Sequence, residues 1–124
     1  MQTANAHTPR SMILFPTRTD WDTARRDAAL ATTGHEDMHA GELEASVLLV
    51  TYPDAVRTGG PEQDHVADDR RLLLSHGMTA YTDSGVIGRP SAATAQKGHA
   101  VLDSLTTSFR HHFQAVAAPG DQDQ

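Results

Sequence analysis

Apolar residues in this chain fall into short runs that are separated by polar and glycine-containing segments. The first run, residues 11–15, is closed by Pro16, which cannot donate a hydrogen bond within a sheet, and it predicts a short buried strand. The spacing that follows predicts an amphipathic helix over residues 21–30, with Thr19 or Asp20 as its N-cap.

A second helix is expected to begin at Ala40 or Gly41 and to end by Tyr52. It cannot continue further, because Pro53 disfavours the helical conformation in the residue before it. Its second half, residues 46–50, is apolar on almost every side, a pattern that is typical of a buried helix.

The C-terminal part of the chain has the clearest pattern. A short helix is expected over residues 68–75, and a very short strand over residues 86–87. Apolar residues then recur at steps of three and four, which predicts an amphipathic helix over residues 92–117 with Ser91 as its N-cap. Its inward face is expected to carry Val101 or Leu102, Leu105, Phe109, Phe113 and Val116. Gly98 costs about 1 kcal/mol relative to alanine inside a helix, so its presence indicates a close helix contact.

Composition narrows the classes of protein. A length of 124 residues suits one domain, here residues 11–117, with a flexible lead-in over 1–10 and a polar tail over 118–124. The net charge of −6 argues against general binding to nucleic acid or to an anionic membrane. The absence of cysteine excludes disulfides, thiolate metal sites and a cysteine nucleophile. The absence of cysteine and the lack of an apolar segment typical of a signal peptide together favour a cytoplasmic protein.

The chemistry of greatest interest lies around the start of the second helix. His39 and Glu44 are separated by about 140° on a helix of 3.6 residues per turn, so they converge only if His39 lies in the turn before the helix. Glu44 shares a stripe with Val47 and Leu48, where a carboxylate is costly unless it is paired, hydrogen-bonded or bound to metal. Glu42 is expected to point into solvent.

Each of these acidic residues also has a purely structural interpretation. Glu44 can form an ion pair with an arginine such as Arg25 or Arg89. Glu36 and Asp37 precede the helix, where the helix dipole favours negative charge, and both can serve as simple capping residues.

A rival motif overlaps the same segment. Residues 35–39 fit the H-E-x-x-H pattern, in which two histidines bind zinc and the glutamate acts as the general base of a peptidase. That chemistry requires one continuous helix, and Gly34 and Gly41 flank the motif. The pattern therefore stands as a lesser alternative.

Two blocks together resemble the creatininase family. Residues 39–46 match H-A-G-x-x-E-[T/A]-S and are followed by an apolar run and a Pro-Asp-x-Val-Arg turn at residues 53–57. Residues 84–98 resemble the stretch S-G-V-x-G-x-P-x-x-A-T-x-x-K-G, which opens the last helix of that family. The resemblance covers roughly residues 11–116 and implies the C-terminal portion of a three-layer α/β/α domain whose N-terminal half is missing.

The resemblance also implies an activity. The family hydrolyses C–N amide bonds, in cyclic amides such as creatinine, in formamides and in a peptide of mycofactocin maturation, with two divalent metal ions, often zinc or manganese, per complete site. It implies that Glu44 is a metal ligand, that His39 handles a proton or stabilises charge at the scissile carbonyl, and that Asp37 supports His39 or touches the substrate. The family's E-x-H-G-x-H-L-P motif, which carries further ligands, is not found, so the metal site of this chain is expected to be incomplete.

These implications extend to partners. A small-molecule amide substrate is expected, together with a homo-oligomer or a missing N-terminal half. The alternative is a non-catalytic remnant or assembly subunit of the same fold.

Overall fold

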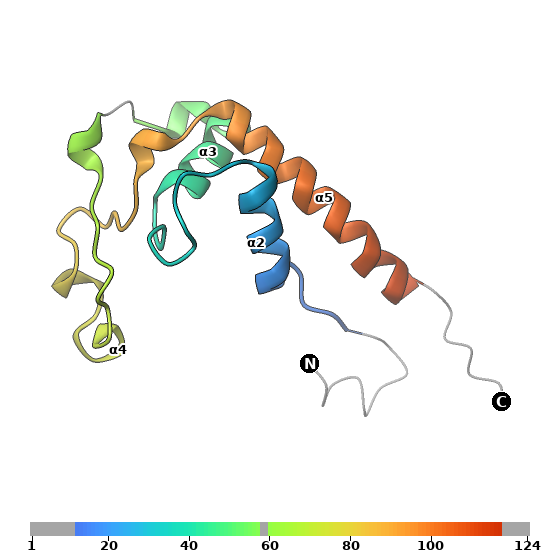
Figure 1. The fold of residues 1–124 in the computed structure, drawn as a ribbon, viewed down its shortest axis with the longest axis horizontal. Coiled ribbons are helices and arrows are strands. Elements are labelled where there is room, and N and C mark those ends of the chain that lie inside the picture. The colour runs from blue at the N-terminus through green and yellow to red at the C-terminus, as the bar shows by residue number, and fades with distance from the viewer. Residues whose placement is uncertain (1–11, 58–59, 118–124) are drawn as a thin grey trace.

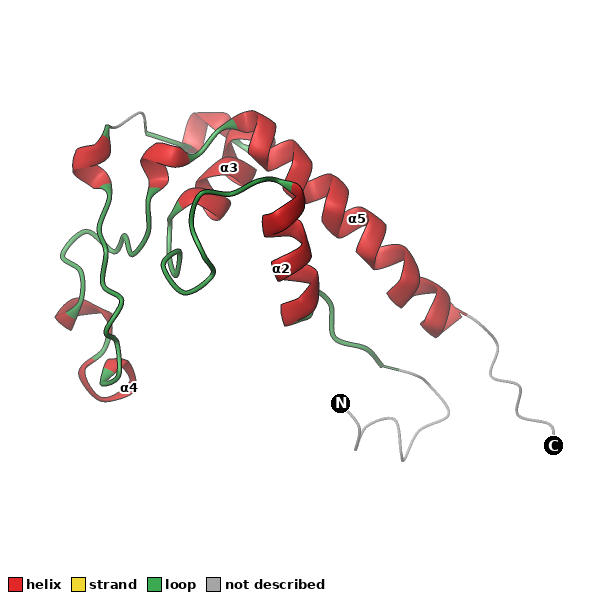
Figure 2. Ribbon diagram, viewed as in Figure 1, coloured by secondary structure: helices red, strands yellow, loops and turns green. Residues whose placement is uncertain are grey.

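The computed structural model describes residues 12–57 and 60–117 of the chain. Within these ranges the elements are helices and short 3-10 turns joined by loops (Figures 1 and 2). The helices are α2 (Arg18–Asp27), α3 (Glu42–Thr51), α4 (Leu73–His76) and α5 (Ala95–Ala117), and the 3-10 turns are η1 (Pro53–Ala55), η2 (Pro61–Gln63), η3 (Met78–Ala80) and η4 (Pro90–Ala92). Both α2 and α3 pack on α5, while the segment that carries α4 extends away from these three helices (Figure 1).

The first described helix begins earlier than the pattern predicts. Helix α2 starts at Arg18 because Thr17 and Asp20 form a capping box, in which Asp20 Oδ2 accepts from the Thr17 amide at 2.7 Å and Thr17 Oγ1 accepts from the Asp20 amide at 3.3 Å. The helix ends at Asp27, and Ala29 has a positive φ of 51°. The helix itself is confirmed, but the predicted N-cap at Thr19 or Asp20 is wrong.

The helix from Glu42 to Thr51 lies within its predicted bounds, but its burial differs from the prediction. Its buried residues are Glu42, Leu43 and Ser46, all in the first half, while Leu48 is 41% exposed. A helix covered on one side by α5 buries one stripe only, so the apolar second half is left partly exposed.

The contact between α3 and α5 is close, as Gly98 indicates. A Cβ atom built on Gly98 would lie 2.0 Å from the carbonyl oxygen of Ser46. The Ser46 hydroxyl also accepts a hydrogen bond of 3.2 Å from the amide of Thr94, one residue before α5. The last helix begins at Ala95, three residues later than the predicted start at Ala92. Ser91 lies within η4, so the prediction that it is the N-cap of this helix is wrong.

The predicted inward face of α5 is buried only near its N-terminal end. Val101 is fully buried, whereas Phe109 and Phe113 are 44% and 58% exposed and Val116 is exposed as well. The buried apolar cluster consists of Ala24, Ala28, Leu43 and Val101. Because α2 and α3 are shorter than α5, they cover only part of its length.

No strand is found in the described ranges. Residues 12–15 lie outside any strand, and Leu14 is 64% exposed, so the prediction of a buried strand is wrong there; residue 11 lies outside the described residues. Ile87 and Gly88 form isolated antiparallel bridges with His39 and His65 in place of the short strand expected at residues 86–87. A three-layer α/β/α arrangement therefore stays a prediction.

Two further expectations concern the ends and the α4 region. Of the helix expected over residues 68–75, a single turn at Leu73–His76 forms. The proposed lead-in over residues 1–10 and the tail over 118–124 lie outside the described residues. Among the helices of the described ranges, none combines the length and the apolar character needed to cross a membrane.

Candidate functional site

The candidate site is the turn that leads into α3. The amide of His39 donates to the carbonyl of Ile87 at 3.0 Å, and the amide of Ile87 donates back to the carbonyl of His39 at 2.9 Å. Ala40 follows with a positive φ of 53°, and Gly41 is packed so closely that an added Cβ would lie 3.1 Å from the Cα of Gly88. His39 thus lies in the turn just before the helix, which is the placement that convergence with Glu44 would need.

The imidazole of His39 is exposed and held in one orientation. Its Nδ1 lies 2.7 Å from the carbonyl oxygen of Gly85. A carbonyl oxygen only accepts hydrogen bonds, so Nδ1 carries the proton of the neutral ring and Nε2 keeps its lone pair. An oriented imidazole with a free Nε2 lone pair is suited to accept a proton or to bind a metal ion.

Glu44, the third residue of α3, reaches back over the first turn of the helix. Its carboxylate accepts a hydrogen bond from the amide of Ala40. Glu44, Val47 and Leu48 line one pocket of about 550 Å³, so they share a stripe as predicted. The stripe is not buried, however, because Glu44 and Leu48 are exposed. The alternative interpretation, an ion pair of Glu44 with Arg25 or Arg89, is not borne out in the described part of the chain, where Arg25 pairs with Asp37 and Glu44 pairs with neither arginine.

The pocket beside Glu44 is mainly apolar. Its walls come from α2, α3 and the segments around Val56 and Val86. Arg57 is the second charged residue that lines it. The pocket can therefore hold an apolar group of a ligand, and its lining offers that ligand two charged side chains, Glu44 and Arg57.

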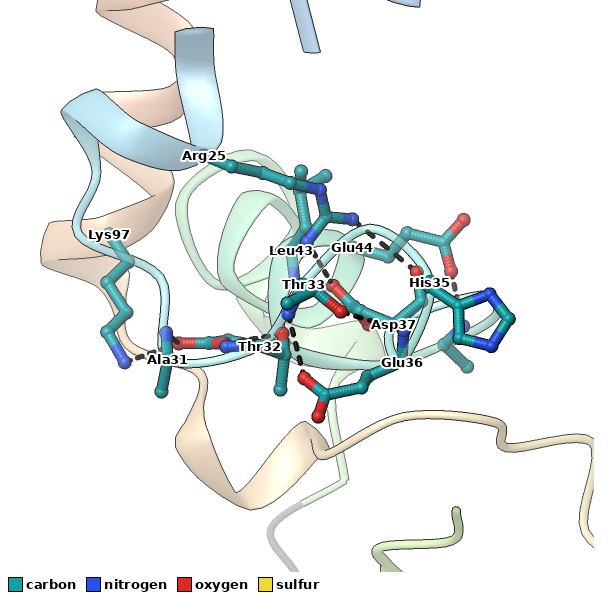
Figure 3. A network of polar contacts seen from close by, with 12 residues as sticks. Arg25, Ala31, Thr32, Thr33, His35, Glu36, Asp37, Leu43, Glu44 and Lys97 are labelled. Carbon is teal, nitrogen blue, oxygen red and sulfur yellow. Dashed lines mark hydrogen bonds and ion pairs between the residues drawn. The ribbon is translucent and has the colours of Figure 1, made fainter. Parts of the chain in front are cut away.

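Asp37 is buried and organises the start of α3. Its Oδ2 lies 3.1 Å from Nη1 of Arg25 and accepts a hydrogen bond of 3.0 Å from the amide of Leu43 (Figure 3). Gly41, the N-cap of α3, has no side chain to cap the helix. Asp37 therefore caps α3 from six residues upstream, which bears out the capping interpretation; Glu36 instead accepts from the amide of Thr33 at 2.9 Å.

We expect Asp37→Asn to destabilise the protein by about 1–3 kcal/mol, because it removes the charge from hydrogen bonds to a guanidinium group and to a helix amide. Urea unfolding followed by circular dichroism measures this loss. Asp54→Asn, at an exposed residue of η1, is the matched control and should change stability by less than about 0.5 kcal/mol. Equal stability of the two variants would contradict the capping role.

Glu42 is the residue that the pattern misplaced. It was expected in solvent, yet it is fully buried, and its carboxylate takes four hydrogen bonds. The donors are the Ala31 amide at 2.9 Å, the Thr32 amide at 2.8 Å, the Thr32 hydroxyl at 2.7 Å and Nζ of Lys97 at 2.6 Å. Burial alone raises the pKa of Glu42, but the hydrogen bonds from Lys97, Ala31 and Thr32 outweigh it, and the net pKa is lowered.

The H-E-x-x-H interpretation is wrong. His35 lies in a turn and His39 in an isolated bridge, so the two histidines are not one turn apart on a helix. Nε2 of His35 lies 2.8 Å from the carbonyl oxygen of Asp68, which directs the ring away from a shared metal.

The described residues do not fit a two-metal centre by themselves. Within residues 12–57 and 60–117, no three His, Cys, Asp or Glu side chains are grouped so that they could hold a metal ion. Glu44 and His39 offer one carboxylate and one imidazole, and Asp37 is already engaged by Arg25 and Leu43. A dinuclear centre therefore needs ligands from outside these residues.

Comparison with known proteins places this site in a class of hydrolases. The family model described as "Creatininase: Creatinine amidohydrolase" matches residues 1–113, a range that includes both His39 and Glu44. The chain belongs to the creatininase family.

Curated relatives carry a peptidase name. The chain is 35% identical over 85 residues to the mycofactocin precursor peptide peptidase of Mycobacterium ulcerans, which is 64% of this chain and 34% of that protein. It is 38% identical over 72 residues to the protein of the same name from Mycobacterium tuberculosis, which is 56% of this chain and 29% of that protein. The chain spans about a third of the length of these relatives, and no solved structure matches it.

Proposed function

We propose that this chain forms part of an amidohydrolase site that cleaves a C–N amide bond in a peptide, with His39 and Glu44 facing the substrate. One observation carries the proposal. Within the residues that match the family, an exposed His39 with a free Nε2 lone pair precedes α3, and the Glu44 carboxylate lies beside an apolar pocket. Asp37 holds the turn in place through Arg25 and Leu43, which makes it a positioning residue.

We favour a peptide over a small cyclic amide as the substrate of this pocket. The volume of about 550 Å³ and the apolar walls suit an amino-acid side chain next to the scissile bond. The relatives with 35% and 38% identity are named as peptide peptidases, which supports the same substrate class.

The roles of the two residues follow from their surroundings. His39 is oriented by the Gly85 carbonyl, so its Nε2 can accept a proton and return it to the leaving amine. Glu44 is the carboxylate that the family resemblance assigns to a divalent metal ion such as zinc or manganese. The described residues supply too few ligands for the metal pair, so the proposed metal role of Glu44 depends on ligands from elsewhere.

The test measures metal content and peptide hydrolysis in the same preparations. We expect His39→Ala to lower kcat about 10²–10⁴-fold, as is typical when a general acid–base group is removed. In a preparation that contains the remaining ligands and binds zinc or manganese, Glu44→Ala should lose that metal, measured by elemental analysis, whereas the matched control Glu62→Ala, at an exposed residue of η2, should keep both metal and activity.

The second candidate function is a non-catalytic assembly subunit of the same fold. It is supported by the shortage of metal ligands among the described residues and by the exposed apolar side chains of α5, Phe109 and Phe113. Protein that contains no metal and hydrolyses no peptide amide would favour this second function and would contradict the hydrolase proposal for this chain.

A further inference from the structure

A second cleft, of about 760 Å³, lies between the outward face of α2, the turn at residues 33–35 and the loop that carries Arg70. We call it the basic cleft, and its defining residues are Arg18, Trp21, Asp22, Arg25, His35 and Arg70. Trp21 also lines the apolar pocket beside Glu44, so the indole is a wall shared by the two cavities.

The basic cleft is assembled from separate parts of the chain. Arg18, Trp21 or Asp22, and Arg25 follow the spacing of one helix face. Arg70 comes from a loop 45 residues beyond Arg25, and the fold brings it to this face.

Two of the three guanidinium groups are held in place before any ligand arrives. Arg70 donates to the carbonyl of His35 at 2.8 Å and to the carbonyl of Ala67 at 2.6 Å. Arg25 is anchored by Asp37 at 3.1 Å (Figure 3). Side chains that are already ordered lose little conformational entropy on binding, so the cleft is preorganised.

The charge balance selects the kind of ligand. Buried Asp37 is paired with Arg25, and the other arginines and carboxylates that line the cleft are Arg18, Arg70 and Asp22, whose formal charges sum to +1. Both ring nitrogens of His35 are engaged within the chain, Nε2 at 2.8 Å from the Asp68 carbonyl oxygen and Nδ1 at 3.5 Å from a guanidinium nitrogen of Arg70. One positive charge remains, which matches a monoanion.

We propose that the basic cleft binds the free carboxylate of a peptide ligand. A planar guanidinium group is suited to carboxylate binding, and Arg18 makes no hydrogen bond or ion pair within the described part of the chain, so it is free to do so. With the carboxylate in the basic cleft, the chain of the peptide passes Trp21 and reaches the apolar pocket beside Glu44. The identification of the ligand as a peptide rests on the proposed function, whereas carboxylate binding is argued from the cleft alone.

Trp21 makes the test direct, because it is the single tryptophan of the sequence. Its fluorescence is titrated with acetyl-leucyl-leucine and, separately, with the C-terminal amide of the same compound. The free carboxylate is expected to bind about threefold to tenfold more tightly than the amide, and the preference should shrink as salt is added.

Arg18→Gln removes the free charge at an exposed position and should abolish the preference for the carboxylate. Arg110→Gln, at an exposed residue of α5 outside the cleft, is the matched control and should retain it. Equal binding of the two compounds to the unmodified chain, or an unchanged preference in Arg18→Gln, would overturn the proposal.

The titration needs no turnover, so it separates the two proposals. A chain that prefers the carboxylate but hydrolyses nothing contradicts the hydrolase function and leaves the basic cleft supported. A chain that hydrolyses peptide amides without the preference contradicts the basic cleft alone.

Discussion

Gly98→Ala is expected to destabilise the protein by about 3 kcal/mol or more, at the upper end of the cost of overpacking a core. The new Cβ would lie 2.0 Å from the carbonyl oxygen of Ser46, 2.7 Å from its carbonyl carbon and 2.8 Å from Cγ2 of Val50. The first two atoms belong to the backbone of α3, so no change of side-chain conformation removes the clash. Alanine gains about 1 kcal/mol of helix propensity over glycine, which is too little to offset the separation of α3 from α5.

The measurement is urea unfolding followed by circular dichroism. Gly34→Ala is the matched control, because a Cβ there would make an ordinary contact of 3.5 Å with the side chain of Arg25. If Gly98→Ala were as stable as this control, the close approach of the two helices would be contradicted.

Glu42→Ala is expected to cost about 3–5 kcal/mol, the range for breaking one side of a buried ion pair. Nζ of Lys97 lies 2.6 Å from Oε1 of Glu42, and the side chains are 23% and 0% exposed, respectively. Together with the amides of Ala31 and Thr32, which also donate to Glu42, the pair connects the loop after α2 to α3 and α5. Without the carboxylate, Lys97 keeps the carbonyl of Ala92 as its acceptor, while two amides and the Thr32 hydroxyl lose theirs.

A double variant separates charge from packing. Glu42→Leu combined with Lys97→Met removes both charges and should recover part of the loss, because a buried pair can often be replaced by apolar groups at little cost. Glu62→Ala, at an exposed carboxylate of η2, is the control and should be close to the unmodified protein. A loss from Glu42→Ala no larger than that of the control would contradict the structural role of the pair.

The same pair predicts a pH dependence. The pKa of Glu42 is lowered from its ordinary value of 4.5, so the folded state binds the proton less readily than the unfolded state does. The stabilisation is therefore present in full above pH 4.5 and is lost as the pH falls through the lower pKa of the folded state. Urea midpoints measured from pH 7 downward should fall more steeply for the unmodified protein than for the Glu42→Leu, Lys97→Met variant.

Local pattern was sufficient for several features of this protein. The bounds of α3 follow from Gly41 and Pro53, and the small residues Ala40 and Gly41 suited the turn that carries His39 before the helix. Gly98 indicated the close contact of α3 with α5, because a glycine inside a helix is costly unless something approaches it. The two sequence blocks identified the family, which the match over residues 1–113 confirms.

Features that depend on distant partners were not accessible in this way. Helix periodicity tells which residues share a face, but not which face meets another element, so Glu42 was expected in solvent and the second half of α3 in the core. The partner that makes burial of Glu42 favourable, Lys97, is 55 residues away. A strand likewise needs a neighbouring strand, and residues 12–15 have none in the described ranges.

The sequence by itself determined that α2, α3 and α5 form, the turn that carries His39 and the family, because each depends on residues close together in the chain or on the order of two motif blocks. Only the tertiary structure decided which carboxylate is buried with Lys97, which one lies beside the apolar pocket, and that Arg70 joins α2 in the basic cleft. The physical reason is the same in each case: burial, ion pairing and cleft formation depend on contacts between segments whose relative positions local propensities do not specify.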